Sequence, residues 1–265
     1  IKIKEGDTVA LLGSLNKVIG VINVEEKYVF DKNIIAEKFY ESDDLNHPGI
    51  KISNSLKPIL LGGKITLFNL EHKEYSNYAL TPRQTRRLFE EKNWTKVVGF
   101  HTRNVIHLAH EYIQLSALKK GNCDGIFIHP VVGSKKPGDY ESEFIVKSYE
   151  MMLNSYYPDD KVVFGVFPAY SRYGGVKEAL FTAICRKNYG CSHFIIGRDH
   201  TGTGGSVNNN KMDIILSQFQ DIGMEIIKYD TVYYSRKQES YVESISEIDK
   251  SDKMSISGTE ARDLL

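Results

Sequence analysis

The stretch FHTRNVIHLAHEYI, residues 100–113, lies where an apolar run meets an amphipathic segment. The run that leads into it, KVVGF (96–100), is short and apolar, which predicts a buried strand. Apolar residues at helical spacing then predict a helix over 105–119. Three histidines, an arginine and an asparagine occupy the turn and the start of that helix. The stretch therefore predicts a strand–turn–helix unit with polar and cationic side chains at its turn.

The same alternation continues along the chain. Four further apolar runs predict strands at 124–130, 161–168, 193–197 and 224–230. Helical patterns are predicted at 141–155, 176–188 and 210–222. A helix is also expected before the first strand, with Thr81 as its N-cap and Pro82 at its first position. Apolar strands that alternate with helices indicate an α/β fold, a Rossmann-like doubly wound parallel sheet.

The first 75 residues have a different pattern. The short β-rich runs TVALLG, VIGVINV and KITLFNL are separated by Gly, Asn, Asp and Pro, and one helical segment, KNIIAEKFYES, lies between them. We therefore predict two domains, a small β-rich domain at 1–75 and the α/β domain at 76–265.

Composition excludes several classes of function. Lys+Arg and Asp+Glu both total 34, so no basic field attracts the chain to nucleic acid or to a membrane. No apolar run approaches the roughly 20 residues that a membrane span needs, and no signal peptide is seen. The three cysteines, Cys123, Cys185 and Cys191, are odd in number and lack metal-site spacing, which predicts reduced thiols in the cytoplasm.

Two turns are expected to meet at one edge of the parallel sheet. Ligands of such sheets bind beyond the carboxyl ends of the strands, at helix N-termini, where an anion is the favoured guest. The first turn carries Arg103, a planar charged fork suited to phosphate or sulfate oxygens, and is followed by His107 and His110 on one helix face. The second, IIGRDHTGTGG (195–205), is rich in glycine and carries an arginine, an aspartate and a histidine. It matches neither the Walker pattern nor G-x-G-x-x-G.

Four collinear segments carry a resemblance to a known family: HTRNVIHLAHEYI, HPVVGSKKPGD, FPAYSRYGGVKEALFTAICRKNYGCSHFIIGRDHTGTG and SISGTEARDLL. Together they resemble the ATP sulfurylase (sulfate adenylyltransferase) family, whose usual forms are Q-T-R-N-P-x-H-x-x-H, R-Y-A-G-P-x-E-A, G-R-D-H-A-G and I-S-G-T-x-x-R. NIIAEKFYESDDLNHPGIK (33–51) resembles the late part of the family's PUA-like domain, and leaves open whether that domain starts before the first residue.

The resemblance implies adenylyl transfer from ATP to sulfate, giving adenosine 5′-phosphosulfate and pyrophosphate. The residues that it assigns to catalysis are Arg103, Asn104, His107, His110 and Arg198. Those that it assigns to the acceptor anion are His101, Thr102, Arg103 and Thr201. Those that it assigns to the nucleotide are Asn104, His107, His110, Gly197, Arg198, Asp199, His200, Ile256, Ser257 and Gly258. Mg²⁺ is implied on the pyrophosphate oxygens, held mainly by substrate, with no protein metal site and no zinc. A homo-oligomer is consistent with the family.

Two departures from the family pattern fall among the acceptor residues. His101 stands where the family has Gln, and Thr201 where it has Ala. Both can still donate to sulfate, but a bulkier, titratable site could also suit phosphate, a phosphonate or a carboxylate. A non-catalytic nucleotide-binding homologue is the third alternative. The pKa of histidine is ordinarily near 6.5, so His101 can change charge in the physiological range. Because Arg103 and a helix N-terminus lie beside it, we expect its cation to be disfavoured in the empty site and restored by a bound dianion.

Overall fold

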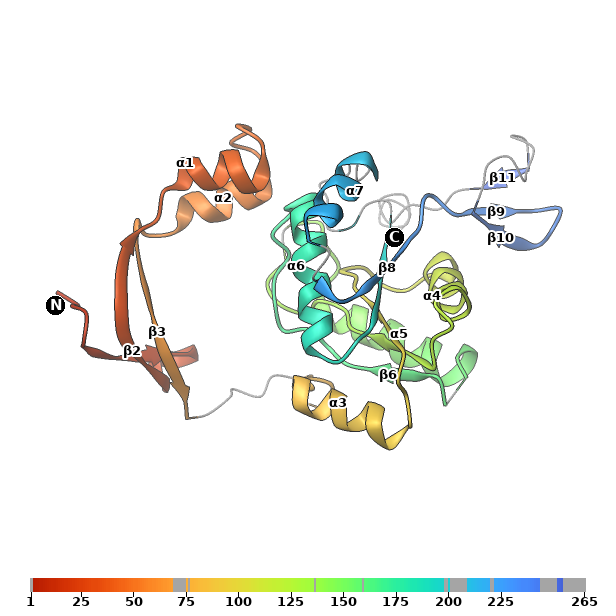
Figure 1. Ribbon diagram of the computed structural model, residues 1–265, viewed down its shortest axis with the longest axis horizontal. Coiled ribbons are helices and arrows are strands. Elements are labelled where there is room, and N and C mark those ends of the chain that lie inside the picture. The colour runs from red at the N-terminus through yellow and green to blue at the C-terminus, as the bar shows by residue number, and fades with distance from the viewer. Residues whose placement is uncertain are drawn as a thin grey trace. The chain divides into compact units, whose positions relative to one another are not determined.

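The structure is a computed structural model of the 265-residue chain, which forms two compact units, Ile1–Ser76 and Asn77–Leu265 (Figure 1). It describes residues 2–68, 75, 77–135, 137–158, 160–197, 200, 209–219, 222–243 and 252–254. Among these residues no helix has the length and apolar character needed to cross a membrane.

The N-terminal unit is an antiparallel sheet with a helical insertion. Its strands are β1 (Thr8–Leu12), β2 (Val18–Val29) and β3 (Ile59–Leu67), in the order β1-β2-β3. A short 3₁₀ turn (Ser14–Asn16) joins the first two strands. Between β2 and β3 the chain forms α1 (Lys32–Ile35), a π-helical turn (Ala36–Tyr40) and α2 (Pro48–Ser55). The sequence indicated the strands and the first helix but not α2, although Pro48 at its first turn is a helix-start signal.

The C-terminal unit contains the predicted parallel sheet. Its five strands are β4 (Val97–Phe100), β5 (Gly125–Ile128), β6 (Val162–Phe164), β7 (His193–Ile196) and β8 (Glu225–Lys228). All neighbouring pairs are parallel, and the spatial order is β6-β5-β4-β7-β8. The chain therefore winds outward from β4 in one direction and, from β7, in the other. That reversal is the topological switch point of a doubly wound sheet.

Helices cover both faces of this sheet, as the sequence predicted. On one face, α4 (Leu108–Lys120) and α5 (Ser142–Tyr156) pack with Val98, Ile126 and Ile195. On the other face lie α3 (Pro82–Glu91), α6 (Gly175–Asn188) and α7 (Asn209–Gln218). The three central strands, β4, β5 and β7, are buried along their whole length, which explains why they appear as continuous apolar runs.

The sequence predicted where two helices begin, and the structure confirms the start of α3 but not that of α4. Thr81 caps α3 as predicted, since its hydroxyl accepts from the N–H of Gln84 while Gln84 Oε1 accepts from the N–H of Thr81. The helix expected from residue 105 instead begins at Leu108, with His107 as N-cap. Thr102 Oγ1 accepts the N–H of Asn104 at 3.1 Å, so the chain forms a local turn before the helix.

A second, small sheet follows β8. Its strands are β9 (Tyr233–Ser235), β10 (Ser240–Val242) and β11 (Lys253–Met254), in the order β10-β9-β11. The polar composition of 237–253 predicts a mobile connector, whereas the described part of that segment includes β10 and β11. Asp252 accepts a 2.6 Å hydrogen bond from the hydroxyl of buried Ser235, which joins Asp252 to the end of β9.

Candidate functional site

The candidate site lies at the carboxyl ends of β4 and β7, the two strands between which the winding direction reverses. His101 is the first residue after β4, and His200 follows β7. Their rings stack with centroids 5.2 Å apart and planes 29° apart, and both residues are buried. Since open parallel sheets bind ligands at this position, the pair marks the place where chemistry is expected.

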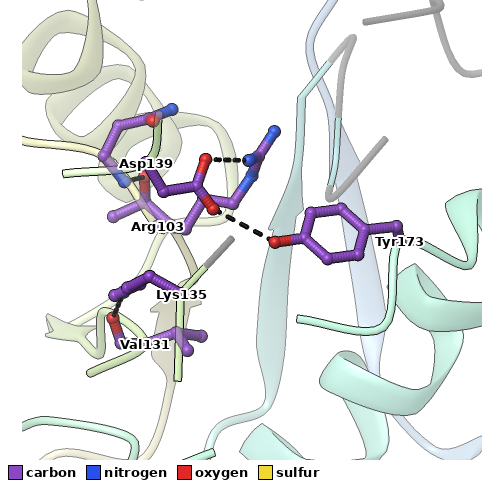
Figure 2. Close-up of polar contacts among 7 residues, drawn as sticks. Arg103, Val131, Lys135, Asp139 and Tyr173 are labelled. Carbon is purple, nitrogen blue, oxygen red and sulfur yellow. Dashed lines mark hydrogen bonds and ion pairs between the residues drawn. The ribbon is translucent and has the colours of Figure 1, made fainter. Parts of the chain in front are cut away.

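Arg103 is held by a carboxylate from a distant loop. Its Nη1 lies 2.7 Å from Oδ1 of Asp139, and the two side chains are only 15% and 2% exposed. Figure 2 shows Asp139 between Arg103 and Tyr173, whose hydroxyl donates to the other carboxylate oxygen at 3.1 Å. The guanidinium carbon also lies 5.4 Å from the centre of the Tyr173 ring. The position of Arg103, in the segment after β4, is thus fixed by Asp139 from the segment after β5 and by Tyr173 from the segment before α6.

A second cation, Lys135, lies in the same loop as Asp139. Its Nζ donates to the carbonyl of Val131 at 2.5 Å (Figure 2). Burial lowers the pKa of Lys135 to about 8, while Asp139 acts to raise it and Arg103 to lower it further. The lysine is therefore close enough to Arg103 to interact electrostatically, and an anion bound between them would favour its charged form.

His107 and His110 form a stacked pair at the start of α4. Their ring centroids are 3.8 Å apart with the planes at 24°, and His110 also contacts the edge of Phe100. Burial lowers the pKa of His107 and holds that of His110 well below its ordinary range. Within the described residues, neither Nδ1 atom has a hydrogen-bond partner. His107 makes no side-chain capping bond, so the first-turn N–H groups of α4 remain suited to an anionic ligand.

Arg186 extends from α6 to the ends of β4 and β5. Its Nη2 lies 2.8 Å from Nδ1 of His101 and donates to the carbonyl of His129 at 2.7 Å. Its guanidinium carbon lies 4.5 Å from the centre of the Phe167 ring. Arg186 is fully buried, and burial lowers its pKa to about 10, which keeps it charged near neutral pH. A permanent positive charge therefore lies directly behind His101.

These surroundings suppress protonation of the stacked histidines. Burial, followed by the charge of Arg186, holds the pKa of His101 well below its ordinary value. The same two causes lower the pKa of His200 to about 3. The predicted direction for His101 is correct, but its causes are burial and Arg186 and not, as expected, Arg103 and the helix N-terminus.

Comparison with known proteins identifies the family. The family model described as ATP-sulfurylase matches residues 76–265, and a PUA-like domain model matches residues 1–70. The chain belongs to the ATP-sulfurylase family. The β-rich unit is accordingly a PUA-like domain, as the sequence predicted.

Two curated relatives of this ATP-sulfurylase-family chain are named sulfate adenylyltransferase. One, from Halothermothrix orenii, is 43% identical over 239 residues, which are 89% of this chain and 62% of the relative. The other, from Ignicoccus hospitalis, is 40% identical over 264 residues, which are 99% of this chain and 68% of the relative. This chain thus spans about two thirds of their length.

A solved structure shares the fold. The chain titled "Hexameric APS kinase from Thiobacillus denitrificans" superposes with a TM-score of 0.73 at 17% identity, covering 98% of this chain and 45% of that chain. At that identity the likeness supports the architecture alone.

The structure brings together the predicted residues that follow β4. His101, Thr102 and Arg103 occupy one turn, and Asn104 is tied to it through Thr102. Gly197 directly follows β7. The remaining predicted residues lie outside the described part of the chain, namely Arg198, Asp199, Thr201, Ile256, Ser257 and Gly258.

Four site residues of this family member were missed by reasoning from the sequence: Lys135, Asp139, Tyr173 and Arg186. Each lies in a quoted motif, but none is adjacent to the turn that it serves. Asp139 ends HPVVGSKKPGD, and Arg186 lies within the helix that precedes β7. The buried face of α6 also carries Glu178 and Thr182, so helical periodicity alone did not single out Arg186.

Metal binding by the protein itself finds no support in the described ranges. There, no group of three or more His, Cys, Asp or Glu side chains is placed to hold an ion. Asp139, the buried carboxylate nearest the site's cations, is occupied by Arg103 and Tyr173.

Proposed function

We propose that the protein transfers the adenylyl group of ATP to sulfate, giving adenosine 5′-phosphosulfate and pyrophosphate. Membership of the ATP-sulfurylase family supports the reaction class, and the names of the two curated relatives support sulfate as the acceptor. The observation that carries the proposal is the position of Arg103, a largely buried guanidinium in the same turn as His101, at the switch point.

In this proposal the turn after β4 binds the acceptor. A guanidinium has five N–H donors, so Arg103 can hold the Asp139 carboxylate and an oxyanion at the same time. His101 and Thr102 offer further donors, as does the backbone of Thr201. Asp139 and Tyr173 keep the guanidinium fork in one orientation, which limits the entropy lost when sulfate binds.

The chemical step is an in-line displacement at the α-phosphorus of ATP. A sulfate oxygen forms the new bond to the α-phosphorus, and the bond from that phosphorus to the α–β bridging oxygen of ATP breaks. That oxygen leaves as a terminal oxygen of pyrophosphate and keeps the electron pair. We assign Asn104, His107, His110 and Arg198 to the phosphate oxygens, where hydrogen-bond donors stabilise charge that grows in the transition state. Gly197, Asp199, His200, Ile256, Ser257 and Gly258 are assigned to the rest of the nucleotide.

Mg²⁺ is expected to enter with the nucleotide. The ion prefers oxygen ligands and keeps several waters, so ATP can supply most of its coordination without a protein cage, which fits the side chains described at the site. When bound, it would neutralise charge on the departing pyrophosphate.

Pyrophosphate release from ATP tests the proposal, measured with sulfate, phosphate, phosphonates and small carboxylates as acceptors. We expect release to depend on sulfate. Arg103→Lys keeps the charge beside Asp139 but loses the two-pronged fork, and should lower turnover at least tenfold, since a charge-assisted hydrogen bond contributes about 1.5–3 kcal/mol. The matched control is Arg87→Lys, because Arg87 lies on the surface of α3 in an exposed ion pair with Glu91. If another anion gave a greater rate of pyrophosphate release than sulfate, that anion would replace sulfate as the proposed acceptor.

Two further properties belong to the proposal. The three cysteines are free, and an enzyme that consumes ATP fits a reducing, ATP-rich compartment, so we infer a cytoplasmic location. We also infer a homo-oligomer, which sedimentation velocity would test.

A further inference from the structure

Arg186 is a buried cation that lacks a counter-ion among the described residues. Its side chain is fully buried, and no described carboxylate pairs with it. Its Nε and Nη1 atoms also have no partner there. Burying an unpaired guanidinium opposes folding, so its place in the core calls for a role beyond packing.

The fold gives this side chain a path across β4. A Cβ added at Gly99 would lie 2.9 Å from Cγ of Arg186, closer than real Cβ atoms approach. The stem of Arg186 thus crosses the strand where a side chain is missing, and its guanidinium emerges at the residues that follow β4 and β5.

The chemistry of the contact fixes the protonation state of His101. Arginine can only donate hydrogen bonds, so Nδ1 of His101 must be the acceptor, and the neutral ring carries its proton on Nε2. A cationic imidazole would need a second proton on Nδ1, directly opposite the Arg186 donor. Nε2 is buried and has no hydrogen-bond partner within the described residues. The ring therefore presents one unused N–H.

We propose that Arg186 is a positioning residue that locks His101 in the neutral tautomer, so that Nε2–H donates to the acceptor oxyanion over the whole range from pH 6 to 8. The proposal rests on the proposed function for the identity of the anion. It replaces the sequence-based expectation that a bound dianion would charge His101. A locked imidazole, like a glutamine amide, donates to the anion without changing its charge over this range.

The groups that face His101 support this assignment. They come from α6, from the segment after β7 and from the loop after β5: Arg186, His200, His129 and Lys135. All four disfavour a second proton on His101. His200 is itself fixed, because Thr182 Oγ1 donates to the carbonyl of Ala179 and lies 2.9 Å from Nε2 of His200.

Nitrogen NMR of the histidine side chains tests the tautomer in the full chain, free and with sulfate. The His101 signals are assigned by their loss in His101→Gln. We expect Nδ1 unprotonated and Nε2 protonated from pH 6 to 8, with no titration in either state. Arg186→Met should introduce a second tautomer or a titration within that range, and Arg186→Lys, which keeps a donor, should restore the single tautomer. A wild-type His101 that titrates, or that carries its proton on Nδ1, would overturn the proposal even if Arg186→Met failed to fold.

Kinetics provide a second readout. The KM for sulfate should not vary with pH in wild type, apart from the contribution of Lys135 above pH 7. In Arg186→Met it should rise roughly tenfold at pH 8, as for a lost donor, and fall toward pH 6 as His101 gains charge. Adding His101→Gln should abolish that pH dependence; its persistence in the double variant would contradict the role assigned to Arg186. Absence of sulfate turnover in a wild type with the expected tautomer would refute the proposed function and not the lock.

Discussion

Replacing Gly99 by alanine tests whether the path of Arg186 is as tightly specified as the structure indicates. The new Cβ would lie 2.9 Å from Cγ and 3.2 Å from Cβ of Arg186, and 3.2 Å from Sγ of Cys191. Arg186 cannot swing away freely, because it is buried and its guanidinium is bonded to two partners. We expect Gly99→Ala to displace it from His101.

The expected loss of stability follows from three contributions. Overpacking a core costs about 1–3 kcal/mol. The buried carbonyl of His129 would lose its donor, which costs about 1–3 kcal/mol more. Removing a glycine from a strand returns about 0.5–1 kcal/mol. The free energy of unfolding should therefore fall by about 1–5.5 kcal/mol.

Urea denaturation of a double-mutant cycle measures this effect. In the Arg186→Ala background Cγ is absent, so adding Gly99→Ala should be less destabilising than in wild type, with a coupling of about 1–2 kcal/mol. Val98→Ala is a control for truncation of the same strand, since Val98 faces α4 and α5 and is expected to be additive with Arg186→Ala. A fully stable Gly99→Ala, or additivity with Arg186→Ala within about 0.5 kcal/mol, would refute the argument.

Three further predictions follow from the site. Burial lowers the pKa of five histidines: His101, His107, His110, His129 and His200. Below about pH 6.5 the unfolded chain binds protons that the folded chain does not. As the pH is lowered below that value, the free energy of unfolding should therefore decrease by up to about 1.4 kcal/mol per pH unit for each histidine. Equal stability at pH 7 and pH 5 in urea titrations would contradict this. Asp139→Ala should raise the KM for sulfate about tenfold and lower the free energy of unfolding by about 3 kcal/mol, because it removes the carboxylate beside Arg103. Tyr173→Phe removes one hydrogen bond to Asp139 and should have the smaller effect. The reverse order would contradict the role of Asp139 in holding Arg103. Alanine at His107 or His110 should lower kcat more than it lowers ATP affinity, and the double variant should lower kcat by less than the product of the two single factors. If both single variants kept the wild-type kcat, the pair would have a structural role only.

The sequence was sufficient to predict the parallel sheet and the turn that bears the site. Buried strands such as Gly125–Ile128 appear as continuous apolar runs, and the polar residues after Phe100 mark a strand end. The start of α4 was misplaced because Thr102 takes the N–H of Asn104, a local competition that periodicity does not detect.

The partners of the site residues could not be predicted in the same way. Asp139 is 36 residues from Arg103, and Arg186 is 85 residues from His101, so both contacts depend on the strand order. The hairpin of β9 and β10 was missed because its strands are short and polar residues surround them. Composition describes such a segment as a connector, whereas its order comes from contacts such as that of Ser235 with Asp252.

Formation of ATP from adenosine 5′-phosphosulfate and pyrophosphate by the full chain tests the central claim most directly, because one reaction reports both the adenylyl transfer and the identity of the acceptor. We predict ATP formation that requires both substrates and Mg²⁺ and that falls at least tenfold in Arg103→Lys but not in Arg87→Lys. A folded wild-type chain that binds ATP yet forms none from these substrates would contradict the account.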